Sequence, residues 1–191
     1  MATATAAQAA PAPEAGPVSD GAPGAIPNVS RDELLRHYRE AERRFGVDWE
    51  FLAAINLVET GMGRIRGTSV AGAQGPMQFM PATWAAYGVG DVRDPRDAVL
   101  GAGRYLDAMG YRSGDRAAVD RALYRYNNHP AYVRGVRLLA EVMQQRPRAY
   151  LGYHAWEVYY LTARGDVLLP VGYAEQQPVP VATYVATTGR R

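Results

Sequence analysis

The chain of 191 residues contains no cysteine and no lysine, and both absences narrow the chemistry that it can perform. Without cysteine there can be no disulfide, no thiolate metal ligand, no cysteine nucleophile and no lipidated cysteine. All basic residues are arginines, which are scattered and form no basic stripe that alternates with aromatic residues. The net charge of +2 is also small. We therefore expect no nucleic-acid partner.

Histidine is scarce, and long apolar runs are missing. His37, His129 and His154 lie far apart and lack the spacing of zinc ligands, so we expect no metal site. No run approaches the roughly 20 apolar residues that cross a bilayer. The N-terminus lacks the charged start and the apolar stretch of a signal peptide. We expect neither a membrane span nor a signal peptide in this chain.

Composition divides the chain into segments. Residues 1–28 are rich in alanine, proline and glycine and cannot bury enough surface to offset the entropy of ordering, which predicts a disordered linker. Residues 29–148 carry helical apolar patterns and are expected to form one helical domain. A hydrophobic share of 48% is sufficient for a core.

Capping signals predict where the helices begin and end. Ser30 and Glu33 form a capping box at the start of the first helix, and Gly46 ends that helix. Asp48 is expected to cap a second helix, whose apolar periodicity continues through Glu59. The glycine-rich connector over residues 61–75 favours neither helix nor strand. Further helices are expected to begin at Pro81, Asp94, Asp115 and Pro130, the last ending near Pro147.

The pattern changes after residue 148. Residues 156–161 and 167–171 are β-prone and are separated by a turn signal, which predicts a β hairpin within an extension over residues 149–175. The hairpin could pack on the helical body, or it could need a partner from outside the chain. Residues 176–191 are expected to form a flexible tail.

One acidic residue stands before a glycine-bent loop. Glu59 lies thirteen residues before Gly72, and residues 72–80 read G-A-Q-G-P-M-Q-F-M. Glycosidic-bond cleavage needs a carboxyl group that keeps its proton near neutral pH. Burial after an apolar helix and the helix C-terminus both raise a carboxyl pKa, so Glu59 is a candidate general acid. The alternative is an exposed residue at a helix end.

Four ordered blocks carry a family resemblance. The blocks are Glu59-Thr60-Gly61, Gly72 to Gln78, Met80 to Thr83, and Tyr126-Asn127. With these blocks, the chain from residue 30 to about residue 146 resembles the soluble lytic transglycosylase family, which has a goose-lysozyme-like fold and cleaves peptidoglycan. The resemblance implies a mainly α, lysozyme-like domain without a metal or organic cofactor.

The resemblance also implies a reaction and a set of site residues. Glu59 would act alone, first as acid and then as base, and the product would be a 1,6-anhydro end on N-acetylmuramic acid. Five further residues are predicted to bind or orient sugar: Thr60, Met77, Gln78, Tyr126 and Asn127.

Some of these five residues also have structural interpretations. Thr60 could bond to its own backbone, Met77 could fill the core, and Tyr126 could be a buried tyrosine with a local partner. The chain departs from the family pattern at Thr60, Pro76 and the pair Asn128-His129, which leaves the local loop geometry open.

Two other functions remain open. A hydrolytic muramidase on the same fold would usually need a second carboxylate, and none falls within the motif blocks. An inactive peptidoglycan-binding module is the other alternative. In each case the partner is the peptidoglycan strand, the protein is expected to be a monomer, and the compartment is expected to lie outside the cytoplasm.

Overall fold

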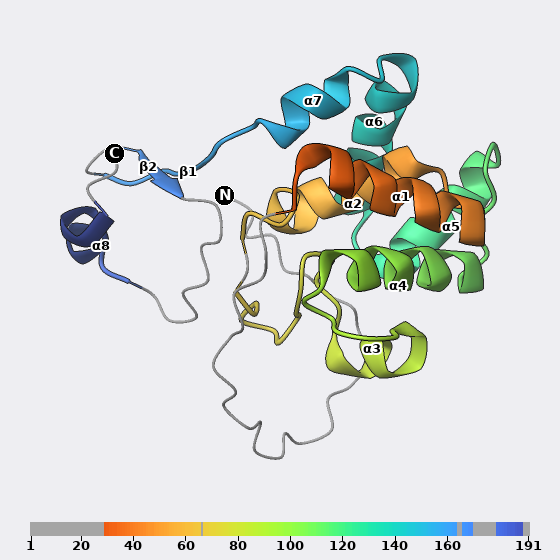
Figure 1. Cartoon of the computed structure of the whole chain (residues 1–191), viewed down its shortest axis with the longest axis horizontal. Helices are drawn as coiled ribbons and strands as arrows, with labels where there is room; N and C mark the ends of the chain where they lie inside the picture. Colours follow the sequence, from red (N-terminus) through yellow and green to blue (C-terminus); the bar gives the residue numbers. More distant parts are fainter. Residues whose placement is uncertain (1–28, 66, 164–165, 170–178, 189–191) are drawn as a thin grey trace.

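The chain is mainly helical, as predicted. The computed structural model describes residues 29–65, 67–163, 166–169 and 179–188. The helical body comprises α1 (Arg31–Phe45), α2 (Trp49–Thr60), α3 (Pro81–Tyr87), α4 (Pro95–Ala108), α5 (Arg116–Tyr126), α6 (Pro130–Gln145) and α7 (Ala149–His154) (Figure 1). Beyond it lie β1 (Val158–Tyr160), β2 (Val167–Leu169) and α8 (Val181–Thr188). The linker predicted for residues 1–28 lies outside the described residues.

The first two helices begin where their capping residues stand. The Ser30 hydroxyl accepts a hydrogen bond from the backbone N–H of Glu33 at 3.2 Å, and Gly46 ends α1 with a positive φ of 66°. Asp48 occupies the N-cap position of α2 but makes no capping bond. Its carboxylate instead accepts from the hydroxyls of Tyr111 and Ser113 at 2.8 and 2.7 Å. The predicted cap is therefore right in position and wrong in its partner.

Helix α2 is the central helix of the body. It contacts α1, α4, α6 and α7, and its residues 51–56 are buried on every side. A helix that is apolar all round is suited to such a position. Its C-terminal turn reaches the surface, where Val58 is exposed and Glu59 is partly open to solvent.

Helix α7 was not predicted, and it extends the helical body beyond residue 148 to His154. Its Tyr150 is fully buried and donates a hydrogen bond to the carbonyl of Arg31 at 2.8 Å. The same ring packs edge-on against Tyr38 and Trp49, at centroid distances of 6.2 and 5.6 Å. This aromatic contact makes α7 part of the core and not of the hairpin extension.

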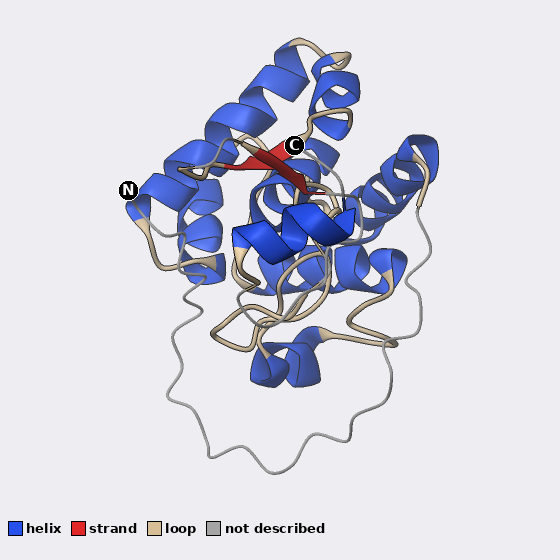
Figure 2. Cartoon of the chain, turned by 90° about the vertical axis from the view of Figure 1, so that its left-hand side faces the viewer, coloured by secondary structure: helices blue, strands red, loops and turns tan. Residues whose placement is uncertain are grey.

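The predicted hairpin is present, and β1 pairs antiparallel with β2 so that Val158 faces Leu169. It lies beyond α7 and away from the helical body (Figure 1), and it is close to α8 (Figures 1 and 2). The Tyr184 hydroxyl of α8 donates to the carbonyl of Leu168 at 3.4 Å. Packing on the helical body was thus a wrong expectation, and α8 stands where the flexible tail over 176–191 was predicted.

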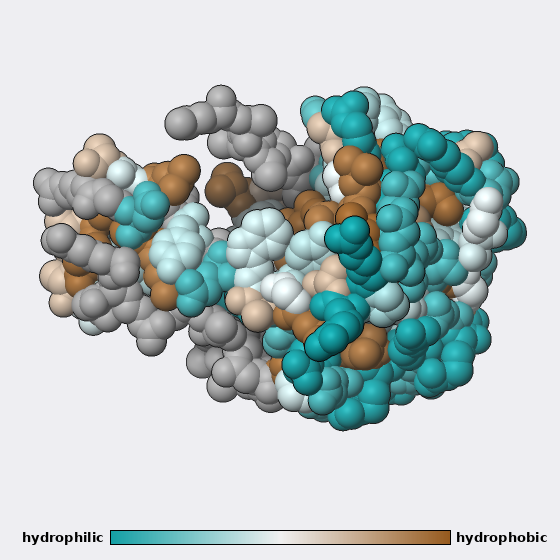
Figure 3. All heavy atoms as spheres, turned by 90° about the horizontal axis from the view of Figure 1, so that it is seen from above, coloured by the Kyte–Doolittle hydropathy of each residue, from teal (hydrophilic) through white to brown (hydrophobic). Residues whose placement is uncertain are grey.

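The outer surface of the helical body is mainly hydrophilic when seen from above, at the right of Figure 3. Within the part of the chain that the structure describes, no helix combines the length and apolarity needed to span a membrane.

Candidate active site

Glu59 lies in the last turn of α2, where the buried helix reaches the surface. Thr60 is the last helical residue, and Gly61 follows with a φ of 61°, which ends the helix in the left-handed conformation. The backbone N–H of Gly61 donates to the carbonyl of Leu57 at 3.0 Å. The Glu59 side chain is partly buried, so one carboxyl group stands at the boundary between core and solvent.

The loop that follows α2 turns back toward this boundary. Gln74 and Phe79 form an isolated antiparallel bridge, with N···O distances of 2.8 and 2.9 Å, around a tight turn. Gly75 has a φ of 74°, and a Cβ atom there would lie 1.9 Å from the carbonyl oxygen of Val92. Gln78 also has a positive φ, of 50°. The turn therefore depends on glycine at position 75 for both its conformation and its close packing.

Buried side chains of α2 hold the turn against the helix. The carbonyl of Pro76 accepts from the Asn56 amide and from the Thr60 hydroxyl, both at 2.7 Å. The Asn56 amide oxygen in turn accepts from the Tyr38 hydroxyl at 2.6 Å. Asn56 and Tyr38 are fully buried. Because a buried polar group is costly unless paired, this chain of bonds strongly favours a single loop position.

A second attachment comes from α5. The Tyr126 hydroxyl donates to the carbonyl of Met77 at 2.6 Å, and Tyr126 is 1% exposed. Two consecutive carbonyls of the turn are thus bound by two different helices. The turn, the end of α2 and the end of α5 form one rigid unit beside Glu59.

The pKa of Glu59 is raised to about 7, and burial is the largest cause. The hydroxyl of Tyr132, in the first turn of α6, acts in the opposite direction and lowers this pKa. Burial also raises the pKa of Tyr126 and Tyr132, and the charge of Glu59 raises both further. A carboxyl group with a pKa near neutrality can both give and take a proton at physiological pH.

Two polar atoms beside this unit are buried and have no hydrogen-bond partner among the described residues. They are the Tyr132 hydroxyl and the side-chain oxygen of Asn127. Tyr132 stands next to Glu59, but no hydrogen bond of ordinary geometry joins them in this structure. Catalytic hydrogen bonds are often long without substrate and shorten in the complex.

Three residues predicted to contact sugar have their side chains inside the protein. Met77 is fully buried in the core, Thr60 is 1% exposed and bonds to Pro76, and Tyr126 bonds to Met77. We assign these three to holding the loop, which matches the structural alternative for Met77 and Tyr126. The Thr60 hydroxyl also contacts the backbone carbonyl of Asn56 in its own helix at 3.4 Å, which was the structural alternative for Thr60.

The other two predicted sugar contacts keep some exposure. Gln78 and Asn127 are each 8% exposed. The Gln78 amide nitrogen donates to the carbonyl of Gly75 at 2.9 Å. Their contact with sugar remains a prediction.

Sequence reasoning missed Asn56 and Tyr132. Asn56 interrupts the apolar run of α2, and an amide in the middle of a buried helix is a signal that a polar partner is needed. Tyr132 carried no comparable signal, because its position next to Glu59 results from the packing of α6 on α2.

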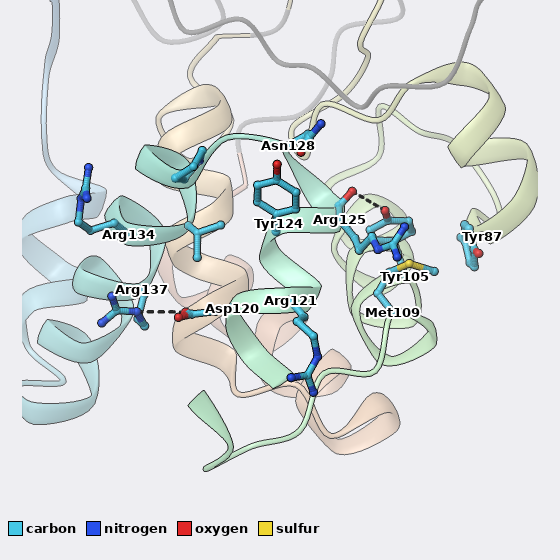
Figure 4. Close-up of a pocket in the computed structure, with 12 residues that line it drawn as sticks. Tyr87, Tyr105, Met109, Asp120, Arg121, Tyr124, Arg125, Asn128, Arg134 and Arg137 are labelled. Atoms are coloured by element: carbon cyan, nitrogen blue, oxygen red, sulfur yellow. Dashed lines mark hydrogen bonds and ion pairs between the residues drawn. The ribbon is translucent and has the colours of Figure 1, made fainter. Parts of the chain in front are cut away.

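A hollow of about 1040 Å³ lies over α5 and does not include Glu59. Its lining contains several arginines, of which Arg137 is paired with Asp120 at 3.1 Å (Figure 4). In Figure 4, Arg134 lies at the left and Arg121 extends downward from the centre, so the two side chains do not converge on one position. Among the described residues, no group of three histidines or carboxylates could hold a metal ion.

Comparisons with known proteins agree with this geometry. The family model of the transglycosylase SLT domain matches residues 36–153, more than half of the chain. A membrane-bound lytic murein transglycosylase F of Thiobacillus denitrificans is 31% identical over 146 residues, which cover 74% of this chain and 31% of that protein. The corresponding protein of Nitrosospira multiformis is 30% identical over 123 residues, or 62% of this chain and 26% of its own length. The chain spans about a third or less of these relatives.

Solved structures share the fold at low sequence identity. A lytic transglycosylase of Escherichia coli in complex with calcium has a TM-score of 0.54 at 17% identity, covering 60% of this chain and 72% of its own. The soluble lytic transglycosylase SltB1 of Pseudomonas aeruginosa has a TM-score of 0.53 at 20% identity, covering 61% and 77%. These structures show the fold, and the family match over residues 36–153 shows that the chain belongs to the family of transglycosylase SLT domains.

Proposed function

We propose that the protein is a peptidoglycan lytic transglycosylase in which Glu59 is the sole general acid and base. The observation that carries this proposal is the Glu59 carboxyl, whose pKa is raised to about 7 at the end of a buried helix. The groups that act on this pKa are burial and Tyr132, and no second carboxylate is among them in the described part of the chain. A one-carboxyl reaction fits this arrangement better than one that needs two.

The reaction has two proton transfers, and Glu59 performs both. The protonated carboxyl gives its proton to the glycosidic oxygen between N-acetylmuramic acid and N-acetylglucosamine as the bond to the anomeric carbon breaks. The substrate's acetamido oxygen stabilises that carbon. The Glu59 carboxylate then takes the proton of the sugar's 6-hydroxyl, whose oxygen bonds to the anomeric carbon and closes the 1,6-anhydro ring. No water is consumed.

The side chains near Glu59 have separate parts in this proposal. Gln78 and Asn127 bind the sugar, since each keeps an exposed fraction and an amide that both donates and accepts. Thr60 and Tyr126 keep the loop in place through Pro76 and Met77.

The compartment follows from the substrate. The curated relatives are named as membrane-bound murein enzymes. We infer that this protein acts on the wall polymer outside the cytoplasm, as a monomer on a glycan strand.

Product analysis tests the proposal. Purified sacculi are digested with the wild type and with Glu59→Gln, and the soluble fragments are identified by mass spectrometry. We expect 1,6-anhydro ends from the wild type. Glu59→Gln should reduce turnover by about 100-fold or more, because the proton donor is lost. Saccharide binding, measured by sedimentation with sacculi, should be retained.

Two other results would each point to a different function. Reducing ends without anhydro sugar would identify a hydrolytic muramidase. Binding to sacculi without turnover by the wild type would identify a peptidoglycan-binding module. Equal turnover by wild type and Glu59→Gln would remove Glu59 from the mechanism.

A further inference from the structure

Two tyrosines lie side by side next to Glu59 and have different environments. The rings of Tyr126 and Tyr132 are stacked, with centroids 6.4 Å apart and an interplanar angle of 4°. Tyr126 belongs to the last turn of α5, and Tyr132 belongs to the first turn of α6. Because the two rings are parallel and adjacent, the hydrogen-bond partners of their hydroxyls can be compared directly.

The Tyr126 hydroxyl is already engaged. It donates its only proton to the carbonyl of Met77 at 2.6 Å. A hydroxyl has one proton to donate, so Tyr126 cannot donate to the Glu59 carboxyl without releasing the loop. In this fold Tyr126 is therefore an anchor of the turn.

The Tyr132 hydroxyl is in the opposite situation. It is fully buried, and it has no hydrogen-bond partner of ordinary geometry among the described residues. Helix α6 packs along α2, which brings the first turn of α6 to the end of α2 and places this hydroxyl next to the Glu59 carboxyl. A buried hydroxyl without a partner is destabilising, and such a group calls for an explanation.

We propose that Tyr132 is a positioning residue for Glu59, donating a hydrogen bond to its carboxylate during the step in which Glu59 acts as base. The inference rests on the proposed function and adds a residue that lies outside the motif blocks. The hydroxyl keeps the charged carboxylate oriented toward the sugar after the first proton has left. Tyr126 keeps the loop in place at the same time.

The charged and titratable groups around Glu59 make the proposal testable by pH. Tyr132 on α6 and Tyr126 on α5 are the titratable groups that interact with Glu59 in the described residues, and no arginine, aspartate or other glutamate is among the causes of its pKa shift. Burial raises the pKa of Glu59 and the Tyr132 hydroxyl lowers it. Removal of that hydroxyl should therefore raise the pKa of Glu59 further.

The experiment compares Tyr132→Phe with Tyr126→Phe, which each remove one oxygen from adjacent stacked rings. The pKa of Glu59 is measured by carbon-13 NMR of the labelled glutamate carboxyl, with Glu59→Gln to assign the signal. We expect Tyr132→Phe to move the midpoint above its wild-type value of about 7 and Tyr126→Phe to leave it in place. This readout does not depend on turnover.

Kinetics on sacculi supply the second readout. Turnover that needs a protonated Glu59 falls as pH rises through the pKa of Glu59. Tyr132→Phe should therefore shift this alkaline limb of the pH–activity profile to higher pH. It should also lower kcat about 10-fold to 100-fold, the value of one hydrogen bond to a charged group. Tyr126→Phe should lower activity without moving the limb.

The outcomes separate this proposal from the proposed function. An unmoved Glu59 midpoint in Tyr132→Phe overturns the role of Tyr132 even if the wild type is an active transglycosylase. A midpoint that moves in both variants equally overturns it as well, because the effect would then come from general loosening. If Tyr132→Phe moves the Glu59 midpoint but the wild type shows no turnover, the contact between Tyr132 and Glu59 stands and only the catalytic function is refuted.

Discussion

Tyrosine hydroxyls in this protein differ in what they contribute to folding. Tyr126 donates to the carbonyl of Met77, whereas Tyr132 has no partner of ordinary geometry in the described residues. Tyr126→Phe leaves a buried carbonyl unpaired and should lower the free energy of unfolding by about 1 to 3 kcal/mol. Tyr132→Phe removes an unpaired hydroxyl and should leave the free energy of unfolding unchanged or raise it. Urea unfolding at pH 5 measures both, since Glu59 is then protonated in each folded protein. Equal losses in the two variants would contradict this difference.

Residue roles could be predicted from the sequence only in part. Glu59 was a candidate because an apolar helical run and a glycine pair mark its position at a helix end, and the motif blocks that follow favoured it over the alternative of an exposed helix-end residue. The sequence left open whether Thr60, Met77 and Tyr126 point inward or toward the sugar. Their orientation depends on hydrogen bonds between residues 16 and 49 positions apart, which only the packing of the helices brings together. Tyr132 was missed for the same reason.

Helices with a capping residue or a proline at their start were predicted closely, and helices without such a signal were not. Helices α1, α4 and α5 begin at side-chain caps that the sequence displays, such as Asp94 and Asp115, whereas α3 and α6 begin at prolines that mark their first turns. Helix α7 has only six residues and no side-chain cap, so its stability comes from the buried Tyr150. Helix α8 is rich in β-branched residues, which have low helix propensity, and its sequence therefore did not indicate a helix.

The turn between Gln74 and Phe79 is the element whose shape matters most for the site. Gly72 and Gly75 both have positive φ, of 87° and 74°. A Cβ atom at position 72 has nothing within 4 Å, whereas at position 75 it would lie 1.9 Å from the carbonyl oxygen of Val92. A side chain at position 72 would therefore cause backbone strain alone, whereas a side chain at position 75 would cause both strain and a steric clash.

Alanine substitutions at these glycines should accordingly differ. Gly72→Ala introduces strain alone, about 1 to 2 kcal/mol. Gly75→Ala adds a clash with backbone and should cost about 1 to 3 kcal/mol more, as overpacking does. Turnover of sacculi by Gly75→Ala should fall about 100-fold, because the displaced turn carries Gln78 away from Glu59. Thermal unfolding and turnover measure both variants. A Gly75→Ala protein as active as Gly72→Ala would show that the turn does not shape the site.

Burial of the Glu59 carboxyl lowers the stability of the whole molecule when that group is charged. In the folded protein the pKa of Glu59 is about 7, against an ordinary value of 4.5, so between these values the folded state holds a proton that the unfolded state has lost. Stability must therefore fall as pH rises through this interval and stop falling above it. The total contribution is on the order of 3 kcal/mol. The proposed active site is thus a source of instability that the remaining core has to offset.

Comparison of the wild type with Glu59→Gln isolates this contribution, because the variant keeps every other titratable group. At pH 5 both folded proteins carry a neutral side chain at position 59, and their free energies of unfolding should be similar. At pH 8 the wild type has a charged, partly buried carboxylate, and Glu59→Gln should be more stable by on the order of 3 kcal/mol. Urea unfolding at the two pH values gives the difference directly. A stability gap that is the same at both pH values would mean that folding leaves the proton affinity of Glu59 unchanged, and the acid step of the proposed reaction would then lose its physical basis.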